Sequence, residues 1–376
     1  MRILITGAAG FIGRHLSERF IGQGHEVIGV DNFITGAWQN LSGFLNHPRF
    51  SFIVADVVKP LNVEGPIDWI LHFASPASPP KYQRHPIETL RSNAEGTYHL
   101  LDLAHRKLAS LLFASSSEVY GDPHEHPQTE RYWGHVNPIG PRSMYDEGKR
   151  YAEALVRQYH LMLGVDVRLI RIFNTYGPRM RKDDGRVIGN FIRQGLVGAP
   201  LTVHGDGSQT RSFQYVDDLI DAIPRVMAAD YTDPINVGNP EEHSVLEVAR
   251  QVRAMTGGWS PIVFEPLPGD DPRQRRPDIA LARRLLDWSP GVSLESGLSR
   301  TIEHIRRVSS HEDAAMSRTR IVADPNGAHP SKEWGEIVPL EPRYAAVSHN
   351  GNGAAGKNGR AAGWNRNESR TRTGAA

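Results

Sequence analysis

Cysteine is absent from this chain of 376 residues. Its absence excludes a disulfide scaffold, thiolate catalysis and metal centres held by cysteine, and it fits a reducing compartment. Long apolar runs are also missing, because no segment reaches the roughly 18 uninterrupted apolar residues of a membrane span. The N-terminus lacks the charged, apolar and small-residue regions of a signal peptide. We therefore expect a cytoplasmic protein with no membrane partner.

An excess of charge of one sign is a further absence. Lysine and arginine number 43 and aspartate and glutamate number 42, which leaves a net charge of +1. This balance predicts no nucleic-acid partner and favours a small molecule instead. The 17 histidines show no metal-binding spacing such as HExxH, so the sequence predicts no metal centre.

Short β-branched runs alternate with amphipathic stretches up to about Ile305. The clearest runs cover residues 2–6, 26–31, 50–56, 69–74, 111–115 and 166–172. Each is typical of a buried parallel strand. The alternation predicts an α/β fold with a doubly wound parallel sheet of the Rossmann type.

Three segments are expected along the chain. Residues 1–186 form the sheet domain, and residues 187–308, punctuated by Pro and Gly, form mainly a smaller C-terminal lobe interleaved with it. A ligand is expected to lie between the two. Residues 309–376 are rich in Gly, Asn, Ala, Ser and Arg and lack apolar periodicity, which predicts a disordered tail.

A glycine-rich turn directly follows the first predicted strand. The segment Gly7-Ala8-Ala9-Gly10-Phe11-Ile12-Gly13 has the spacing GxxGxxG and opens a helix over about residues 11–23. Gly7 permits the tight turn, Gly10 lets the backbone approach a pyrophosphate, and Gly13 lets the helix pack closely on the strand. The phosphates would face the helix N-terminus. The predicted dinucleotide-binding residues here are Gly7, Gly10, Phe11, Ile12 and Gly13.

Acidic residues at two strand ends favour NAD as the dinucleotide. Asp31 closes the second strand, where a carboxylate accepts hydrogen bonds from the adenosine ribose and repels the 2′-phosphate of NADP. Arg14 is the one contrary signal, because a cation could receive that phosphate. Asp56 follows the third strand and either accepts from the adenine amino group or closes a turn, and spacing leaves both open. Asn32 and Val57 flank these carboxylates and are predicted to contact the same cofactor.

A Ser-rich strand end and a Tyr/Lys pair carry the predicted chemistry. Tyr145 and Lys149 are four residues apart, which puts them on one face of a helix. A neighbouring ammonium and a cationic nicotinamide ring favour a phenolate, so Tyr145 is a candidate base for an alcohol. Tyr-x-x-x-Lys is common by chance, but here it follows both the glycine turn and the serines at 115–117.

In this order the motifs make the chain resemble the extended short-chain dehydrogenase/reductases, and within them the UDP-glucuronate decarboxylases, or UDP-xylose synthases. The resemblance covers about residues 1–308 and rests on long strings as well as on the shared motifs. These strings are residues 75–80 (SPASPP), 117–123 (SEVYGDP), 133–142 (WGHVNPIGPR), 145–150 (YDEGKR), 172–180 (IFNTYGPRM) and 207–211 (GSQTR).

The resemblance implies a redox-neutral conversion of UDP-glucuronate to UDP-xylose. The sugar is oxidised at C4 with bound NAD, loses CO2 from C5, and takes the hydride back. By resemblance, Tyr145 is the base for the C4 hydroxyl, Lys149 lowers its pKa and holds the nicotinamide ribose, and Ser116 hydrogen-bonds O4. Many relatives carry Thr at the position of Ser116.

Glu118 separates this reaction from a dehydration. In similar nucleotide-sugar 4,6-dehydratases an Asp-Glu pair follows the Ser or Thr, and its Asp protonates the departing hydroxyl. Ser117 replaces that Asp here, which disfavours dehydration and leaves Glu118 beside C5 or the carboxylate. A strand-end carboxylate that holds a backbone N–H is the alternative for Glu118.

The resemblance also implies contacts to the substrate. Arg211 and Arg275 match arginines that hold the pyrophosphate, and the position of Arg275 has also been assigned as a proton donor to C5, a choice the sequence leaves open. The remaining candidates are Asn174 near the phosphates, Asn190, Tyr82 and Arg91 near the sugar carboxylate, and His204 near the uracil.

A homodimer is implied as well, because in relatives the helices that carry the Tyr/Lys pair pack across a two-fold axis. The helix predicted over about residues 145–159 has apolar positions to spare at Ala152, Leu155 and Val156. Two alternatives to the decarboxylase are a UDP-sugar 4-epimerase, which generally lacks a Glu at position 118, and a non-catalytic NAD-binding protein, which typically lacks the Tyr or the Lys.

Overall fold

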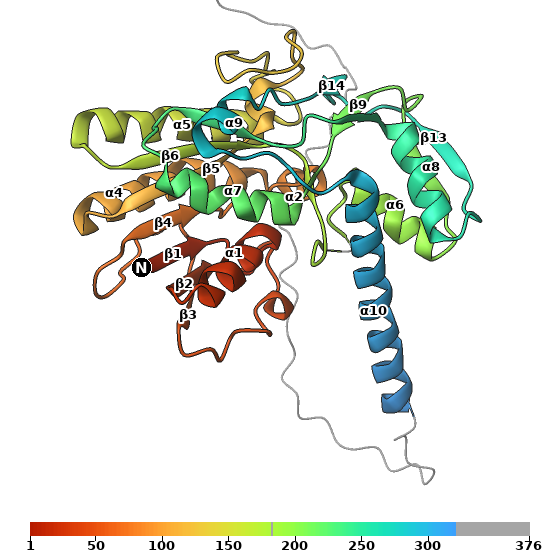
Figure 1. Cartoon of the computed structure of the whole chain (residues 1–376), viewed down its shortest axis with the longest axis horizontal. Helices are drawn as coiled ribbons and strands as arrows, with labels where there is room; N and C mark the ends of the chain where they lie inside the picture. Colours follow the sequence, from red (N-terminus) through yellow and green to blue (C-terminus); the bar gives the residue numbers. More distant parts are fainter. Residues whose placement is uncertain (182, 321–376) are drawn as a thin grey trace, which may run out of the picture. The chain divides into compact units, whose positions relative to one another are not determined.

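Seven strands form one parallel sheet at the centre of the structure, a computed structural model that describes residues 1–181 and 183–320 (Figure 1). Across the sheet the strands lie in the order β11 (Pro234–Val237), β6 (Val167–Ile172), β5 (Ser110–Ser116), β4 (Trp69–His72), β1 (Arg2–Thr6), β2 (Glu26–Asp31) and β3 (Phe50–Val54). All neighbouring pairs are parallel. The predicted doubly wound α/β fold is therefore confirmed.

The direction of winding reverses between β1 and β4. The chain moves outward from β1 to β3, returns to β4 beside β1, and then moves outward on the other side. Ligands of such sheets bind beyond the carboxyl ends of the strands at this reversal, which is where the glycine turn after β1 lies.

Helices cover both faces of the sheet. The main ones are α1 (Phe11–Gly22), α4 (Thr97–Lys107), α5 (Ser143–Leu163) and α7 (Val216–Ala228). The first packs beside α7, and α4 packs beside α5. Side chains of β1 alternate between the two layers, because Ile3 and Ile5 join a core with α1 and α7 whereas Leu4 joins a core with α4 and α5.

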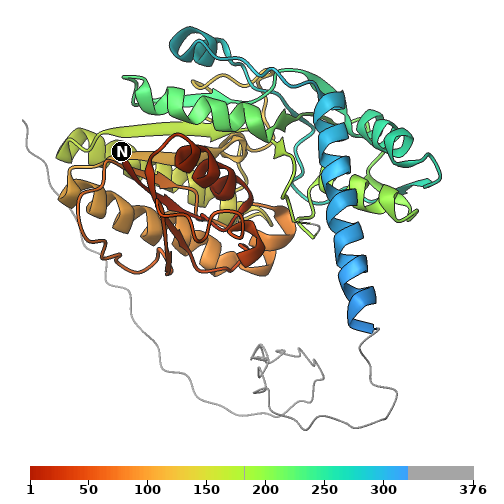
Figure 2. The same cartoon turned by 60° about the horizontal axis from the view of Figure 1, so that its bottom comes forward.

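A smaller lobe lies at one end of the sheet (Figure 2). It contains α6 (Val187–Leu196), α8 (Val245–Thr256), β8 (Leu201–His204), β9 (Thr210–Ser212), β12 (Glu242–Ser244), β13 (Ile262–Glu265) and β14 (Gln274–Arg275). Helices α6 and α8 pack together, β8 pairs with β13, and β9 lies between β12 and β14. The segments after residue 186 do not all stay in the lobe, since α7 and β11 return to the sheet.

The remaining elements are short connections and the C-terminal helix. They are η1 (Trp38–Asn40), α2 (Pro79–Arg84), α3 (Pro86–Arg91), η2 (Ser92–Gly96), η3 (Ser117–Tyr120), β7 (Thr175–Tyr176), β10 (Gln214–Tyr215), α9 (Ala280–Leu286) and α10 (Leu294–Arg320). No helix among the described residues is long and apolar enough to cross a membrane.

The disordered tail is predicted to start at residue 309, but helix α10 extends beyond that position. It continues past residue 308 as far as Arg320 (Figure 1). Apolar periodicity ends near Ile305, but good helix formers such as Ala314, Ala315 and Met316 follow, so the backbone stays helical without a buried face in the sequence pattern. The rest of the predicted tail, residues 321–376, lies outside the described residues.

The prediction that α5 has apolar positions to spare is wrong for Ala152 and Val156. Ala152 and Val156 are fully buried in the core against α4 and the sheet, so the fold of the single chain uses them. Tyr98 on α4 and Tyr151 on α5 are half exposed instead.

Candidate active site

A cavity of about 160 Å³ lies at the carboxyl ends of β1, β2 and β3. Its lining includes every residue predicted from the glycine turn and the strand ends, namely Gly7, Gly10, Phe11, Ile12, Gly13, Asp31, Asn32, Asp56 and Val57. We refer to it as the cofactor cavity. The structure thus brings together residues that are up to 50 positions apart in the chain.

Backbone geometry explains the glycines of this cavity. Gly7 has a φ of +72°, and a Cβ there would lie 2.7 Å from the carbonyl oxygen of Phe73. A Cβ on Gly13 would lie 2.1 Å from the carbonyl oxygen of Gly7, so only glycine allows the helix to approach the turn. No side chain caps α1, which begins after Gly10 with no acidic residue in its first turn. The free N–H groups and the positive end of the helix dipole are therefore available to a phosphate.

Asp31 is placed to select the nucleotide. Its carboxylate accepts from the backbone N–H groups of Ala9 at 3.0 Å and Phe33 at 2.8 Å, and burial raises its pKa. Arg14 does not face this cavity, because its Nε donates to the carbonyl oxygen of Asn40 at 3.1 Å. The contrary signal for NADP is thereby removed. Asp56 lines the cavity and closes a turn by accepting from the N–H of Val58, and its contact with the adenine amino group stays a prediction.

A larger cavity of about 530 Å³ lies between the sheet and the lobe. The predicted residues that line it are Ser116, Glu118, Tyr145, Lys149, Asn174, Asn190, His204, Arg211 and Arg275. We refer to it as the catalytic cavity. Ile12, Phe73 and Arg186 line both cavities, so a ligand can extend from one into the other.

Tyr145 and Lys149 share one face of α5 and are both buried. Burial raises the pKa of Tyr145 to about 12, and hydrogen bonding with Ser116 counteracts this rise. The Nζ of Lys149 donates to the carbonyl oxygen of Ala114 at 2.8 Å and lies 5.6 Å from the centre of the Tyr145 ring. Burial lowers the pKa of Lys149 to about 7. The fold thus holds a phenol and an amine close together in a site that disfavours charge on either of them.

Two predicted substrate residues lie elsewhere. Tyr82 does not line the catalytic cavity but stacks under Tyr145, with ring centroids 5.2 Å apart and an interplanar angle of 10°. Its buried hydroxyl has no hydrogen-bond partner among the described residues. Arg91 lines the cofactor cavity and pairs with Glu95 at 2.8 Å, so its guanidinium is not among the cations of the catalytic cavity.

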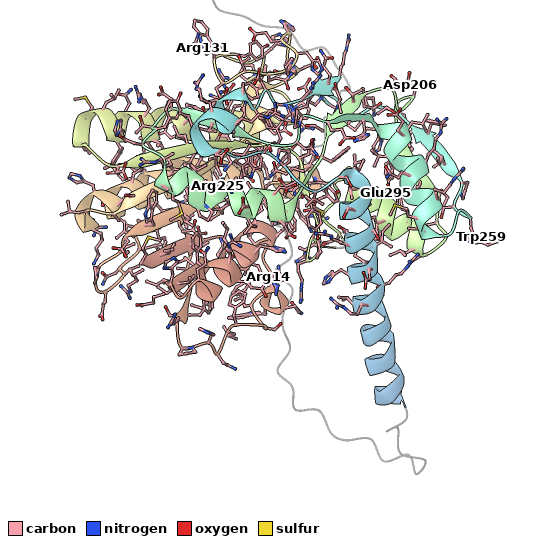
Figure 3. The ribbon with its side chains drawn as sticks, in the orientation of Figure 1. Arg14, Arg131, Asp206, Arg225, Trp259 and Glu295 are labelled. Atoms are coloured by element: carbon pink, nitrogen blue, oxygen red, sulfur yellow. The ribbon has the colours of Figure 1, made fainter. Side chains whose placement is uncertain are left out.

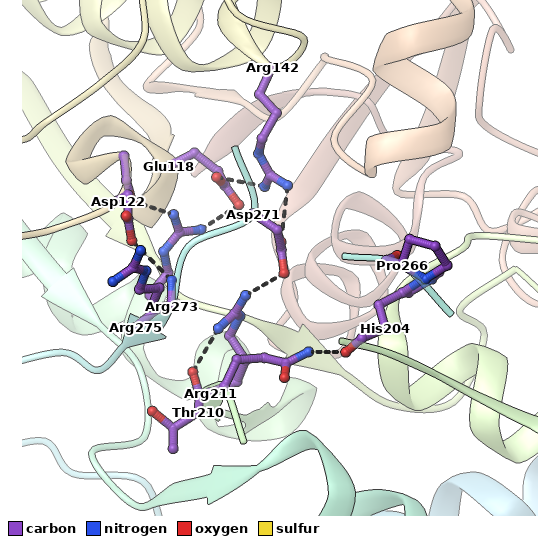
Figure 4. Close-up of polar contacts among 12 residues, drawn as sticks. Glu118, Asp122, Arg142, His204, Thr210, Arg211, Pro266, Asp271, Arg273 and Arg275 are labelled. Atoms are coloured by element: carbon purple, nitrogen blue, oxygen red, sulfur yellow. Dashed lines mark hydrogen bonds and ion pairs between the residues drawn. The ribbon is translucent and has the colours of Figure 1, made fainter. Parts of the chain in front are cut away.

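Glu118 and the arginines around it form the most concentrated group of charges in the catalytic cavity (Figure 4). One oxygen of Glu118 lies 2.5 Å from Nη1 of Arg275, and the other lies 2.8 Å from Nη2 of Arg142. Burial alone would raise the pKa of Glu118, but the two arginines outweigh it and lower the pKa to about 2. Glu118 is therefore a fixed carboxylate at neutral pH.

Arg142 and Asp271 are the site residues that sequence reasoning missed. Asp271 bridges two arginines, with Nη2 of Arg211 at 2.8 Å and Nη1 of Arg142 at 3.3 Å (Figure 4). Arg142 ends the string at 133–142 that carries the resemblance, and Asp271 lies four residues before Arg275, but neither has a motif of its own. Only the meeting of the loop at 266–273 with α5 reveals them.

The buried amine of Lys149 leads to a prediction about stability. Its pKa falls from an ordinary 10.5 to about 7, so between these pH values the unfolded chain binds the extra proton. Stability should therefore rise with pH across this window, by up to about 1.4 kcal/mol per pH unit, and the penalty should be fully present below it. The Lys149→Met variant should lack this slope and be more stable than the parent at pH 7. Urea unfolding at several pH values, without nucleotides, measures the difference.

The exposed Lys59 offers the matched control for that measurement. Lys59→Met removes the same charge from the surface and should leave the slope of the parent unchanged. Parallel stability curves for the parent and the Lys149 variant would contradict a depressed pKa for Lys149.

Residues 3–238 of the chain match the NAD dependent epimerase/dehydratase family. This region contains the glycine turn of the cofactor cavity and the Tyr145/Lys149 pair. The chain belongs to this family.

Curated relatives within the family are named UDP-glucuronic acid decarboxylase. One from Danio rerio is 53% identical over 311 residues, which cover 83% of this chain and 74% of the relative. One from Arabidopsis thaliana is 50% identical over 313 residues, which cover 83% of this chain and 72% of the relative. The resemblance to the UDP-glucuronate decarboxylases is therefore confirmed.

Solved structures of the epimerase/dehydratase family share the fold and carry the predicted cofactor. UDP-glucuronic acid 4-epimerase from Bacillus cereus, in complex with UDP-glucuronic acid and NAD, is 30% identical with a TM-score of 0.74 and covers 82% of this chain and 100% of its own. A dTDP-glucose 4,6-dehydratase from Streptomyces venezuelae, with NAD bound, is 27% identical with a TM-score of 0.75. The match covers 83% of this chain and 98% of the dehydratase chain. The prediction of NAD as the cofactor is confirmed by the family and these complexes.

Proposed function

We propose that this chain is a UDP-glucuronate decarboxylase, which converts UDP-glucuronate to UDP-xylose with bound NAD and no net redox change. Relatives at about half identity over most of the chain bear this name. The observation that carries the proposal is the catalytic cavity itself, which sets a Tyr/Lys pair beside arginines suited to an anionic sugar nucleotide. Its test is the release of labelled CO2 from UDP-glucuronate labelled at C6, with catalytic NAD.

The cofactor cavity fits NAD by its own geometry. The uncapped start of α1 faces the pyrophosphate, and the carboxylate of Asp31 accepts from the ribose hydroxyls while repelling a 2′-phosphate. Asn32, Asp56 and Val57 enclose the adenosine end. When bound there, NAD would supply the hydride acceptor and donor for C4, and its cationic ring would favour the phenolate form of Tyr145.

Tyr145 acts as the base that removes the proton of the C4 hydroxyl. Ser116, which hydrogen-bonds with the phenol, positions the same oxygen. The amine of Lys149 lies close enough to the ring to stabilise a phenolate when it carries a proton. A C4 ketone then accepts the electrons left at C5 when CO2 departs, so the protein needs only to bind, orient and move protons.

Glu118 orients the cations and does not itself exchange a proton. Its pKa of about 2 keeps it ionised, and its two oxygens hold Arg275 and Arg142 in place. The guanidinium of Arg275 also donates to the carbonyl oxygen of Gly121 at 2.8 Å. A fixed, fully charged Arg275 is a good clamp for an anion and a poor acid, so we assign it the clamp role. Ser117 leaves the dehydratases' acid position without a carboxyl group.

The nucleotide end of the substrate lies toward the lobe. Arg211 holds the diphosphate, and Asn174 and Asn190 line the same catalytic cavity. His204 is the exposed last residue of β8 and lines the catalytic cavity, where its ring can stack on the uracil. The stacking of Tyr82 on Tyr145 gives it a positioning role beneath the base.

Asp271 pairs with the guanidinium of Arg211, the group that we expect to bind the diphosphate. Because its carboxylate pairs with Arg211 at 2.8 Å, UDP must displace it in order to bind. The Asp271→Asn variant should therefore bind UDP more tightly, by about tenfold or more, since a hydrogen bond to a charged group contributes about 1.5–3 kcal/mol. Isothermal titration calorimetry with UDP measures the change.

Asp270 provides the control for this substitution. It is the neighbouring residue, it bonds the exposed Asn137, and its φ of +57° is one that asparagine tolerates. Asp270→Asn should leave UDP affinity unchanged. Weaker binding by the Asp271 variant would mean that Asp271 holds the arginines ready and does not compete with the phosphates.

The alternative activity is a UDP-sugar 4-epimerase, because the epimerase from Bacillus cereus shares the fold. The paired Glu118 and the arginines around it favour the decarboxylase. Incubation with UDP-glucose separates the two, because that substrate has no carboxylate to lose. We expect no UDP-galactose, and its formation at a rate comparable to CO2 release would favour the epimerase.

We also propose that two copies of the chain pair through α4 and α5. Tyr98 and Tyr151 are half exposed on these helices. The ring centroids of Tyr98 on α4 and Tyr159 on α5 lie 6.2 Å apart. The variant Tyr98→Glu/Tyr151→Glu places charges on this face and should sediment as a monomer in analytical ultracentrifugation, where the parent sediments as a dimer. A matched change at Trp259, an exposed residue between α8 and β13 in the lobe, should leave the dimer intact.

The cytoplasmic location and the absence of membrane and nucleic-acid partners stay predictions from the sequence.

A further inference from the structure

A third hollow of about 320 Å³ lies outside both cavities of the proposed reaction. It is formed by α1, by the loop that follows β7, and by α10, and the loop passes between the two helices in both views (Figures 1 and 2). Its arginines are Arg14, Arg179, Arg300 and Arg307. None of them lines the cofactor cavity or the catalytic cavity.

The positive charge of this hollow exceeds the acidic groups that face it. Two histidines, His15 and His304, join the arginines, and the acidic residues among the described lining residues are Glu18 and Glu303. Glu18 lies 3.3 Å from Arg14, whose side chain is 4% exposed. Figure 3 labels Arg14 on α1. Arg300 approaches Asp217 only at 3.8 Å. Burial, followed by the charges of Arg179, Arg307 and Arg14, lowers the pKa of His304 to about 4, as expected where cations converge.

Arg179 is the most informative member of the group. It has neither a hydrogen bond nor an ion pair to any described residue, although it faces Arg14 and His304 closely enough to shift their pKa values. Its φ is +70°, a left-handed conformation that is costly for a side chain such as arginine. The neighbouring Gly177 shows that glycine is used in this loop. Within the described part of the chain, Arg179 is therefore a cation without a partner, placed among other cations on a strained backbone.

We propose that this hollow binds a phosphate-bearing small anion. Arginine forks match the oxygens of phosphate, and a partly buried cluster of them binds such an anion more strongly than it binds chloride. A volume of about 320 Å³ admits more than a single phosphate group, so pyrophosphate or the phosphates of a nucleotide also fit. The anion would offset the repulsion among the arginines of α1, of the loop after β7 and of α10.

Thermal unfolding of the full chain tests this inference with the other cavities filled. Saturating NAD and UDP occupy the cofactor and catalytic cavities. The rise in melting temperature that these two ligands cause tests the proposed function separately from the phosphate site. Inorganic phosphate at about 10 mM should then raise the melting temperature by roughly 2 °C or more beyond NaCl at equal ionic strength. Pyrophosphate and ATP as further probes distinguish an inorganic from a nucleotide source.

The Arg179→Gly variant gives a signature that a merely structural residue would not show. Without phosphate it should melt higher than the parent, because strain and repulsion are relieved, and it should lose the added shift from phosphate. Leu108→Gly is the matched control, since Leu108 is exposed with a φ of +54° at the end of α4. That variant should keep the full phosphate shift. Arg300→Ala, an exposed change on α10, should reduce the shift as well.

Two results would overturn the inference. One is a parent protein, saturated with NAD and UDP, whose melting temperature responds to phosphate no more than to NaCl. The other is an Arg179→Gly variant that retains the phosphate shift of the parent.

Discussion

Replacing Tyr145 with phenylalanine is expected to lower kcat on UDP-glucuronate by about 10²–10⁴-fold, the usual contribution of a positioned base. The substitution removes only the hydroxyl, so the stacking with Tyr82 and the burial of the ring persist. KM should change by no more than about threefold, because the substrate's charges are bound by arginines and not by the phenol. Steady-state measurement of CO2 release gives both parameters.

Tyr82 provides an internal control for this experiment. Its ring lies 5.2 Å from that of Tyr145, but its hydroxyl is buried without a partner among the described residues. Tyr82→Phe should keep kcat within about threefold and should not lower stability, because it removes an unsatisfied polar atom. If Tyr145→Phe retained more than a tenth of the activity, the assignment of Tyr145 as the base would be wrong.

Replacing Glu118 with glutamine is expected to lower both stability and kcat. The two arginines that Glu118 pairs with, Arg275 and Arg142, are 2% and 9% exposed. Arg142 would keep its pair with Asp271, but Arg275 would be left as an uncompensated buried charge. Breaking such a pair costs about 3–5 kcal/mol. A guanidinium displaced by about 1 Å would also lower kcat by about 10²-fold. Urea unfolding and steady-state kinetics measure the two effects.

The pH profile distinguishes a positioning role for Glu118 from a proton-transfer role. With a pKa of about 2 the carboxylate does not titrate in the working range, so the profile of the weakened variant should run parallel to that of the parent. Loss of one limb of the profile in the glutamine variant would make Glu118 an acid or base and contradict our assignment.

Glu153 is the matched control for the loss of a buried carboxylate. It pairs with Arg171 at 2.7 Å, it is 13% exposed where Glu118 is 14% exposed, and it does not line the catalytic cavity. Glu153→Gln should lower stability by a similar amount but lower kcat much less than Glu118→Gln, because Glu153 acts on the site indirectly, through the charge of Lys149 and through Ser115. If both variants lost kcat equally, the effect of Glu118 would reflect instability alone.

Local backbone chemistry explains why the cofactor cavity was predictable. Gly7 and Gly13 occupy positions where any Cβ would collide with backbone. Asp31 is the last residue of a strand that the run of buried residues before it makes recognisable in the sequence. Such constraints act over a few neighbouring residues, so spacing reveals them. Tyr145 and Lys149 are predictable for the same reason, because four residues make about one helical turn.

Tertiary approach explains what the sequence could not reveal. Arg142 and Asp271 meet only because the loop after β13 reaches across to the start of α5, a contact without a local pattern. The edge strand β11 is short and begins with Pro234, which breaks the appearance of a strand in the sequence. Tyr82 was expected at the sugar, and its stacking under Tyr145 depends on how α2 packs against α5.

One NMR experiment tests the central claim most directly. The full chain is incubated in D2O with catalytic NAD and UDP-glucuronate carrying ¹³C at C6, and the label and the sugar protons are followed together. We predict labelled CO2, UDP-xylose with deuterium at C5, and no net NADH, because the ketone at C4 forms and is reduced again in one active site. UDP-galacturonate that retains the C6 label would instead identify an epimerase and contradict the decarboxylation mechanism.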